Sequence, residues 1–263
     1  MTTLQAIILG AVQGIAEFLP ISSSGHLIVL QRVFGMEEPA MTFDIIVHVG
    51  SLLAIIVVFW RDIFAILKNP LQKMTGLLIV GTIPVVVAGF LMRNVMETSF
   101  RSGLWLACAF AVTGLFLLLA DKIPMGKKEE RDVNYLDAII IGFFQALALP
   151  PGISRSGTTI MGALTRGLTR ETAAKFSFML AIISIAGAGT LEAVEVVREG
   201  ELTGTVGVPQ LLIGFAVSAI VGYVAIRLLL KLINACKLRY FSFYVWGLAA
   251  LILADYIIFN RFF

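Results

Sequence analysis

Charged residues and cysteine are both scarce in this chain of 263 residues. Asp, Glu, Lys and Arg make up 14% of it, against about 25% in soluble globular proteins, and hydrophobic residues make up 59%. Only Cys108 and Cys236 are cysteines, and both lie in or beside apolar stretches, which excludes a disulfide framework or a cysteine metal cluster and favours packing. No basic residue precedes Arg32, so we expect no cleaved signal peptide.

Apolar runs of membrane-spanning length recur along the whole chain. Runs of about 18 or more apolar residues indicate transmembrane helices. Strand-length alternating segments are absent, which argues against a membrane barrel. The sequence therefore predicts an all-α polytopic membrane protein. Each half contains five apolar segments, at 4–19, 23–34, 42–60, 76–96 and 104–120, and at 136–149, 154–167, 173–197, 206–231 and 241–259.

The two halves resemble one another in sequence. Residues 4–26 read LQAIILGAVQGIAEFLPISSSGH and align without a gap with residues 136–158, LDAIIIGFFQALALPPGISRSGT. The aligned pairs include Gln13 with Gln145, Ser22 with Ser154, Ser24 with Ser156, and Gly25 with Gly157. We interpret the chain as a single membrane domain of two repeats, 1–131 and 132–263.

The first two segments of each half are too short to cross a bilayer. Residues 23–34 would form a helix about 18 Å long, whereas the hydrocarbon core is about 30 Å thick. A short pair joined by a Pro/Gly/Ser turn predicts a re-entrant helix pair, leaving three full spans per half and six in all. Three is odd, so the repeats are expected to have inverted topology, with the two turns meeting at mid-depth. If the short pairs spanned fully, the turns would lie at opposite surfaces instead.

Basic residues divide unequally between the two sides of this topology. One side carries Arg32, Arg93, Arg101, Arg198 and Arg261. The other carries Arg61, Lys68, Lys73, Lys122, Lys127, Lys128, Arg131, Arg166, Arg170, Lys175, Lys231, Lys237 and Arg239. Because cytoplasmic loops are enriched in Lys and Arg, we expect the second side to be cytoplasmic and both termini to lie outside. The run KKEERD at 127–132 is interpreted as a solvated loop between the repeats.

The two turns have the composition of an anion site. Helices that begin near Ser23 and Ser154 would point unpaired N–H groups and partial positive charge into the turns, with serines as N-caps. Arg155 adds a guanidinium whose fork matches phosphate or carboxylate oxygens, and an arginine at membrane depth is a functional hypothesis by default. The alternative interpretation of Arg155 is a structural ion pair with Glu17.

Groups able to carry out chemistry stand beside the first turn. Gln13 and Glu17 are spaced i,i+4 on one helix face and could offer oxygens to Mg²⁺ or Ca²⁺. Ser23 and His26 are spaced i,i+3, a plausible nucleophile and base. Together with Arg155, these residues could carry out a displacement at phosphorus. His48, within DIIVHVG, lacks such a context, and packing or an interhelical hydrogen bond is the favoured interpretation for it.

With Q-x-x-x-E at 13–17, PISSSGH at 20–26 and PGISRSGTT at 151–159, the chain resembles the bacterial undecaprenyl pyrophosphate phosphatase family linked to bacitracin resistance. The resemblance covers the length of the chain. It departs from many relatives at Gln13, where they carry Glu, so Glu17 is the expected essential carboxylate.

The resemblance implies hydrolysis of the C55 isoprenoid diphosphate to the monophosphate, which recycles the lipid carrier of cell wall synthesis. It implies a divalent cation, Mg²⁺ or Ca²⁺, held by Glu17 and Gln13, and a site open to the outer face of the bacterial plasma membrane. It implies that Ser23 is the nucleophile, that Glu17 and His26 handle the proton or the metal, and that Arg155 holds the diphosphate. The other residues implied in substrate binding are Ser22, Ser24, Gly25, Ser154, Ser156, Gly157 and Thr159.

Other functions remain open from the residues alone. Inverted repeats with paired re-entrant loops are also typical of transporters, so a transporter or flippase for a lipid phosphate is the alternative. An intramembrane serine protease would also use Ser and His, but Arg155 and two helix N-termini suit phosphate better than a peptide carbonyl. The expected partners are a polyprenyl diphosphate and membrane lipids, with no nucleic acid, and apolar faces such as 104–120 could support a homodimer.

Overall fold

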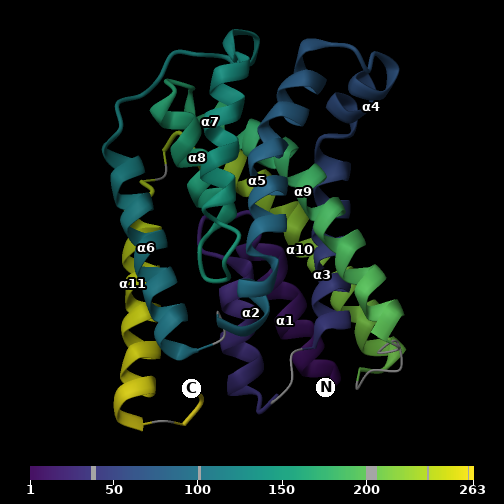
Figure 1. Cartoon of the computed structure of the whole chain (residues 1–263), viewed down its shortest axis with the longest axis vertical. Coiled ribbons are helices and arrows are strands. Elements are labelled where there is room, and N and C mark those ends of the chain that lie inside the picture. Colours follow the sequence, from purple (N-terminus) through teal and green to yellow (C-terminus); the bar gives the residue numbers. More distant parts are fainter. Residues whose placement is uncertain (37–39, 100–101, 200–205, 236, 260) are drawn as a thin grey trace.

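The computed structural model describes residues 1–36, 40–99, 102–199, 206–235, 237–259 and 261–263. The fold of these residues is all helical (Figure 1). The first half contains α1 (Thr3–Ala16), α2 (Ser23–Val33), α3 (Met41–Val58), α4 (Trp60–Lys68), α5 (Lys73–Ser99) and α6 (Gly103–Lys122). The second contains the 3₁₀ turn η1 (Glu130–Asp132), α7 (Tyr135–Ala146), α8 (Arg155–Thr165), α9 (Arg170–Glu199), α10 (Val208–Leu232), α11 (Arg239–Ala254) and the π-helical turn η3 (Asp255–Phe259).

Six helices are long and apolar enough to cross a membrane. They lie at Met41–Val58, Lys73–Met92, Gly103–Lys122, Arg170–Val194, Val208–Leu232 and Arg239–Phe259. This confirms the predicted all-α polytopic membrane protein with six spans. The short helices α1, α2, α7 and α8 are the other four of the ten predicted segments. Whether they are re-entrant, and whether the repeats are inverted in a bilayer, stays a prediction.

The short helix pairs begin with matching caps. Thr2 and Gln5 form a capping box at the start of α1, and Asn134 and Asp137 form one at the start of α7. These positions are 132 residues apart, the offset of the sequence alignment. Such boxes satisfy two otherwise unpaired N–H groups at each helix start. The matching halves therefore have matching local structure at their first helices.

The first helix of each short pair packs on a long helix of the other half, and the two contacts involve aligned glycines. Helix α1 lies against α10, and α7 lies against α5. At Gly10 an added Cβ would meet the Gly214 carbonyl at 2.7 Å, and at Gly142 it would strike the Gly81 carbonyl. Glycine is thus required at both aligned positions for close helix approach, as is common between helices in membranes. Each contact joins a helix of one half to a helix of the other half. The two contacts together therefore hold the halves in one unit.

The two short pairs approach each other from opposite ends of the molecule. Helices α1 and α2 lie in the lower half of Figure 1 and α7 and α8 in the upper half, with their turns near the middle. Beside the turns lies an apolar cluster in which Phe18 and Phe178 meet edge to face, with ring centroids 5.7 Å apart. The turns are therefore placed against a packed core.

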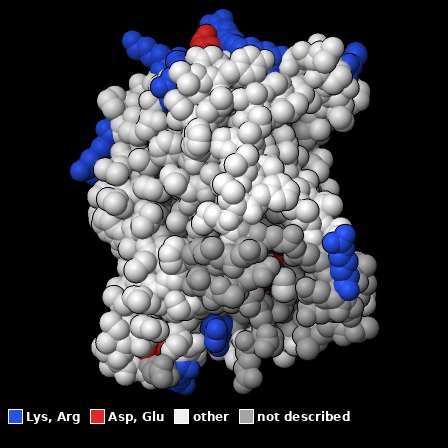
Figure 2. Space-filling model, in the orientation of Figure 1, with Lys and Arg blue, Asp and Glu red and all other residues white. Residues whose placement is uncertain are grey.

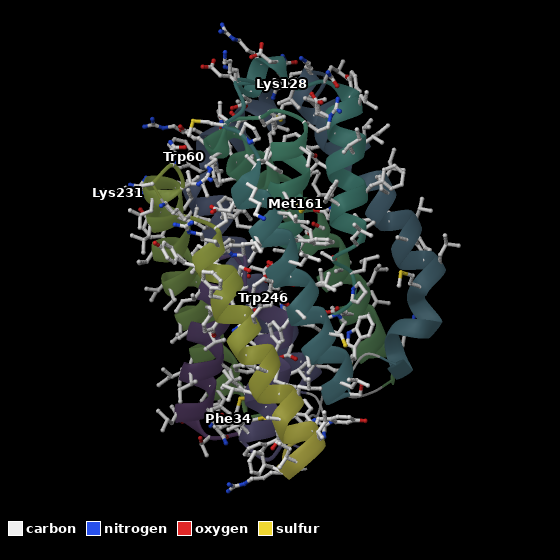
Figure 3. The ribbon with its side chains drawn as sticks, turned by 90° about the vertical axis from the view of Figure 1, so that its left-hand side faces the viewer. Phe34, Trp60, Lys128, Met161, Lys231 and Trp246 are labelled. Carbon is white, nitrogen blue, oxygen red and sulfur yellow. The ribbon has the colours of Figure 1, made fainter. Side chains whose placement is uncertain are left out.

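Basic side chains gather at one end of the long axis. On the face shown in Figure 2, most Lys and Arg residues lie at the end that carries α4 and the start of α7. Figure 3 places Lys128, Lys231 and Trp60 toward this same end and Phe34 near the other. The clustering agrees with the unequal division expected from the sequence. Of the basic residues in that division, Arg101 lies outside the described residues, and the Arg93 side chain is not described. Cys236 also lies outside the described residues.

Three expectations from the sequence are corrected by the structure. Residues 61–68, expected in the connection between the apolar segments 42–60 and 76–96, belong to α4, because an apolar residue recurs every three to four positions in WRDIFAILK. The run 127–132 is exposed as expected except at Lys128, which donates from Nζ to both carboxylate oxygens of the fully buried Asp137, at 3.1 and 3.0 Å. Cys108, expected to be packed, is exposed on α6.

Candidate active site

The carboxylate of Glu17 is the centre of a buried polar cluster. Glu17 follows the last residue of α1 and is 7% exposed. Gln13, one turn earlier, donates from Nε2 to Glu17 Oε2 at 3.0 Å. Ser23, the first residue of α2, donates from Oγ to the same oxygen at 2.6 Å. The first turn therefore brings a hydroxyl against a carboxylate that can accept its proton.

Arg155 brings the second turn to the same carboxylate. It is the first residue of α8, and its Nη2 donates to Glu17 Oε1 at 2.5 Å. Its Nη1 lies 3.5 Å from the Ser177 carbonyl of α9. The ion pair considered as the structural alternative is thus present. It also places the guanidinium on the carboxylate that Ser23 contacts, where a bound anion could share it.

Further contacts lock the two turns together. Ser156 donates from Oγ to the Leu19 carbonyl at 3.1 Å. An added Cβ at Gly25 would meet the Gly152 Cα at 3.0 Å. Such contacts leave little room between the backbones, so the small residues of both motifs serve close approach.

The serines of the motifs divide into caps and other hydroxyls. Ser22 and Ser154 accept from the N–H groups of Gly25 and Gly157, at 3.4 and 3.1 Å, as N-caps. This confirms the expectation that at least one of the three consecutive serines is a cap. Ser24 lies 3.5 Å from the Ser22 hydroxyl.

Thr159 lies deeper than the turns. It is fully buried on α8, and its hydroxyl is 2.5 Å from the Ser177 hydroxyl and 2.8 Å from the Arg155 carbonyl to which it donates. It thus supports the segment that carries Arg155.

His26 bonds to other partners than Ser23. Its Nδ1 lies 2.7 Å from the Ser22 carbonyl, and its Nε2 lies 2.8 Å from the Tyr244 hydroxyl of α11. Ser23 instead bonds to Glu17. In this structure the group placed to take the Ser23 proton is therefore Glu17, and the pairing of Ser23 with His26 stays a prediction.

The structure adds residues that the sequence reasoning did not place in the site. His48 of α3 has its Nε2 3.7 Å from Glu17 Oε2, and Ser51, one turn on, lies 3.5 Å from Gln13 Nε2. Packing was the favoured interpretation of His48, because no motif surrounds it. The signal that could have found both is their i,i+3 spacing, which sets two polar side chains on one face of an otherwise apolar span.

A cleft of about 750 Å³ runs between α3 and α9, which lie side by side (Figure 1). It is lined by Ile45, Val49 and Leu52 of α3 and by Ile185, Gly189 and Arg198 of α9, among others. His48 lies within one helical turn of Ile45 and Leu52. The cleft is apolar except at Thr190 and Arg198. It is linked to the Glu17 cluster through His48, which directly precedes the lining residue Val49.

The fold and site together define a multi-pass helical membrane protein with a buried polar centre where two turns meet. The chain belongs to the family described as bacitracin resistance protein BacA, which it matches over residues 6–251.

Individual relatives resemble the chain over nearly its whole length. It is 43% identical over 253 residues to the undecaprenyl-diphosphatase of Carboxydothermus hydrogenoformans, covering 96% of this chain and 97% of the relative. It is 44% identical to undecaprenyl-diphosphatase 4 of a Bacillus cereus strain, with the same coverage. It is 40% identical over 272 residues to the undecaprenyl-diphosphatase of Alkaliphilus metalliredigens, covering 96% and 98%. These comparisons confirm the resemblance inferred from the motifs.

Proposed function

We propose that this chain is an integral membrane undecaprenyl diphosphate phosphatase that releases phosphate and returns the C55 monophosphate to cell wall synthesis. The observation that carries the proposal is the contact of Ser23 and Arg155 with opposite oxygens of the Glu17 carboxylate. A nucleophile, a proton acceptor and a charge-neutralising group thus share one buried site. The relatives' names favour this hydrolase over the transporter alternative.

Ser23 is the proposed nucleophile and Glu17 its general base. Ser23 Oγ already donates to Glu17 Oε2, so the carboxylate can take this proton as Oγ attacks the terminal phosphorus. The bond from that phosphorus to the bridging oxygen breaks, and the lipid monophosphate leaves. Water then hydrolyses the phosphoserine. His26, on the same helix, is proposed to handle a proton in one of these steps.

Two helix starts and Arg155 would stabilise the charge of the diphosphate. The first N–H groups of α2 and α8 point into the turns, and a helix N-terminus favours an anion. Arg155 would then share its guanidinium between Glu17 and a phosphate oxygen, which its several N–H donors allow. The other residues of the two motifs would set the shape of the phosphate site, and they are Ser22, Ser24, Gly25, Ser154, Ser156, Gly157 and Thr159.

The oxygens beside Glu17 fit a divalent cation such as Mg²⁺ or Ca²⁺. Gln13 Oε1 is buried and has no hydrogen-bond partner, so it is an acceptor that a cation could satisfy. Among the described residues no three His, Cys, Asp or Glu side chains form a metal cluster, so Gln13, Glu17 and substrate oxygens would hold the ion. Bound there, the cation would neutralise phosphate charge.

The α3–α9 cleft is the proposed site of the prenyl tail. On α3 the apolar lining includes Val49, the residue after His48. On α9 the lining residues fall in the half of the helix that lies away from the basic end. A tail in this cleft would place the diphosphate next to Glu17 while the chain remains in the membrane.

The proposed topology places the basic end in the cytoplasm of a bacterial plasma membrane, with both termini outside and the repeats inverted. The gathering of Lys and Arg at the end with α4 supports it (Figure 2). The cleft then opens toward the outer face, from which the lipid would enter. A homodimer through exposed faces such as that of α6 is a further proposal.

The test is phosphate release from undecaprenyl diphosphate by purified protein in detergent, with and without EDTA. We expect metal-dependent release by the wild type and loss of release in Arg155→Ala. No release by folded wild type with any divalent cation would overturn the enzyme proposal and favour lipid transport instead.

A further inference from the structure

Both ring nitrogens of His26 have a defined partner. Nδ1 lies 2.7 Å from the Ser22 carbonyl, which can only accept, so Nδ1 carries a proton. In the neutral ring Nε2 is then the acceptor, and the Tyr244 hydroxyl, 2.8 Å away, donates to it. His26 can therefore exchange a proton only through Nε2, the atom that faces Tyr244.

The backbone is arranged to hold this tautomer. Ser22 has a φ of +71°, the only positive value among non-glycine residues in the part of the chain that the structure describes. Such a conformation is strained for a residue with a side chain and persists where surrounding contacts enforce it. Here the carbonyl of Ser22 accepts both from Nδ1 and from the backbone N–H of His26, the latter at 3.3 Å.

Aromatic rings fix the plane of the imidazole on two sides. The Tyr244 ring is within 10° of the His26 plane, with centroids 5.6 Å apart, and Phe110 stands at 89° to it, at 5.3 Å. His26 is 8% exposed, whereas Tyr244 is 50% exposed. His26 lies in the first turn of α2, so the contact joins α11 to the helix start beside the first motif turn.

We propose that Tyr244 is a positioning residue for His26. Its hydroxyl keeps the imidazole from turning over and holds the Nε2 lone pair in one direction, so that the nitrogen that exchanges protons is always the same atom in the same place. When Nε2 is protonated, the bond reverses and Nε2–H donates to the tyrosine oxygen. This role rests on the proposed function, in which His26 transfers a proton during phosphate release.

The matched variants are Tyr244→Phe and Tyr240→Phe. The first removes only the hydroxyl and keeps the ring against His26. The second removes a hydroxyl from an exposed tyrosine one turn earlier on α11. We expect kcat of Tyr244→Phe to fall about tenfold, as for the loss of one hydrogen bond, with KM within about twofold of wild type. Tyr240→Phe should match the wild type.

A spectroscopic readout separates positioning from a general structural effect. The chain has two histidines, so ¹⁵N-histidine spectra of the protein in detergent resolve His26 from His48. We expect the Nε2 signal of His26 to move toward that of a free imidazole nitrogen in Tyr244→Phe alone, with His48 unmoved. An unchanged His26 spectrum, or an equal loss of kcat in Tyr240→Phe, would overturn the proposal. If the wild type released no phosphate, the proposed function would fail while the spectra still reported the contact.

Discussion

Glu17 and Arg155, 138 positions apart in the chain, form an ion pair through Glu17 Oε1 and Arg155 Nη2 at 2.5 Å. Neither residue has an oppositely charged neighbour in its own motif, so each depends on the other turn for its partner. A buried pair is costly to break from one side only, because the remaining charge is left without compensation. The pair therefore couples the integrity of the site to the meeting of the two turns.

Replacing Arg155 should separate charge from geometry. Arg155→Lys keeps a positive charge but loses the fork that can bond a carboxylate and a phosphate together. We expect phosphate release to fall at least about a hundredfold in Arg155→Lys, the loss typical for one charge-stabilising group, and to be abolished in Arg155→Ala.

The control is Arg239→Ala, at the start of α11, where the half-buried guanidinium lies over the Tyr240 ring and touches no residue of the site. Phosphate release and thermal unfolding would be measured together for the wild type and the three variants. Full activity of a folded Arg155→Lys protein would contradict a bidentate role.

Much of this architecture could be predicted from the sequence because its signals are local. Six spans follow from the lengths of apolar runs, and the starts of α2 and α8 follow from serines at N-cap positions. The repeat also predicted that the two turns meet, whereas the contact of Glu17 with Arg155 was only the alternative interpretation of Arg155.

The residues that sequence reasoning missed are those whose role arises only from tertiary packing. His48 reaches Glu17 from α3, and Tyr244 meets His26 across 218 positions. Neither belongs to a motif, and both lie in spans where a polar group reads as a packing residue. Helix α4 was missed for another reason: its nine residues include the charged Arg61, Asp62 and Lys68, and its apolar stretch IFAIL is too short to register as an apolar run.

Ser23 should be indispensable if it is the nucleophile. Ser23→Ala removes the hydroxyl that donates to Glu17 and should lower kcat below detection, with little change in unfolding temperature because the residue is only half-buried. Ser102→Ala removes the N-cap serine of α6, outside the site, and should keep its activity. Trapping of ³²P on protein by acid quench would check the covalent step. Wild-type rates in Ser23→Ala would mean that Glu17 activates water instead.

His48 should influence which cation the site prefers. Its Nδ1 lies 2.7 Å from the Asp44 carbonyl, so Nδ1 carries the proton and Nε2 offers a lone pair toward Glu17. This arrangement is common in histidines that bind metals, and imidazole favours transition ions over Mg²⁺. We expect His48→Gln to weaken Mn²⁺ binding about tenfold or more while Mg²⁺ binding changes less, as measured by electron paramagnetic resonance of free Mn²⁺ with Mg²⁺ as competitor.

The matched control for this variant is Asp62→Asn on α4. In the wild type the Asp62 carboxylate accepts from Lys175 Nζ at 2.6 Å. It should leave Mn²⁺ binding unchanged. Equal weakening in both variants would show that the effect of His48 is indirect.

Asp137 should make stability depend on acidity. Burial alone would raise the pKa of its carboxyl, but hydrogen bonds from Lys128 and Arg166 outweigh this and lower the pKa. A lowered pKa in the folded state means that the carboxylate stabilises the fold above its ordinary value of about 3.9, and that this stability is lost as pH falls below it. Unfolding temperature of the wild type should therefore drop as the pH is lowered below about 4.

The same drop should be smaller in Asp137→Asn, which has no carboxylate to protonate and should unfold a few degrees lower at neutral pH. Asp132→Asn, in the exposed turn η1, is the comparison variant and should retain the wild-type pH dependence. An identical pH profile for Asp137→Asn and wild type would assign acid sensitivity to other groups.

Filling the α3–α9 cleft should discriminate between long and short substrates. At Gly189 an added Cβ would meet no atom within 4 Å, so a larger side chain enters the cleft without striking the backbone. A polyprenyl tail of eleven isoprene units must pass this position if it lies in the cleft, whereas the three units of farnesyl diphosphate are short enough to remain near the turns. Gly189→Phe should raise KM for the C55 substrate about tenfold or more, as expected for the displaced apolar contacts, and leave KM for the C15 substrate within about twofold. Gly247, on α11 and also without a neighbouring atom within 4 Å, offers the control Gly247→Phe. If Gly189→Phe changed KM equally for both chain lengths, or not at all, the tail would have to lie along another face of the molecule.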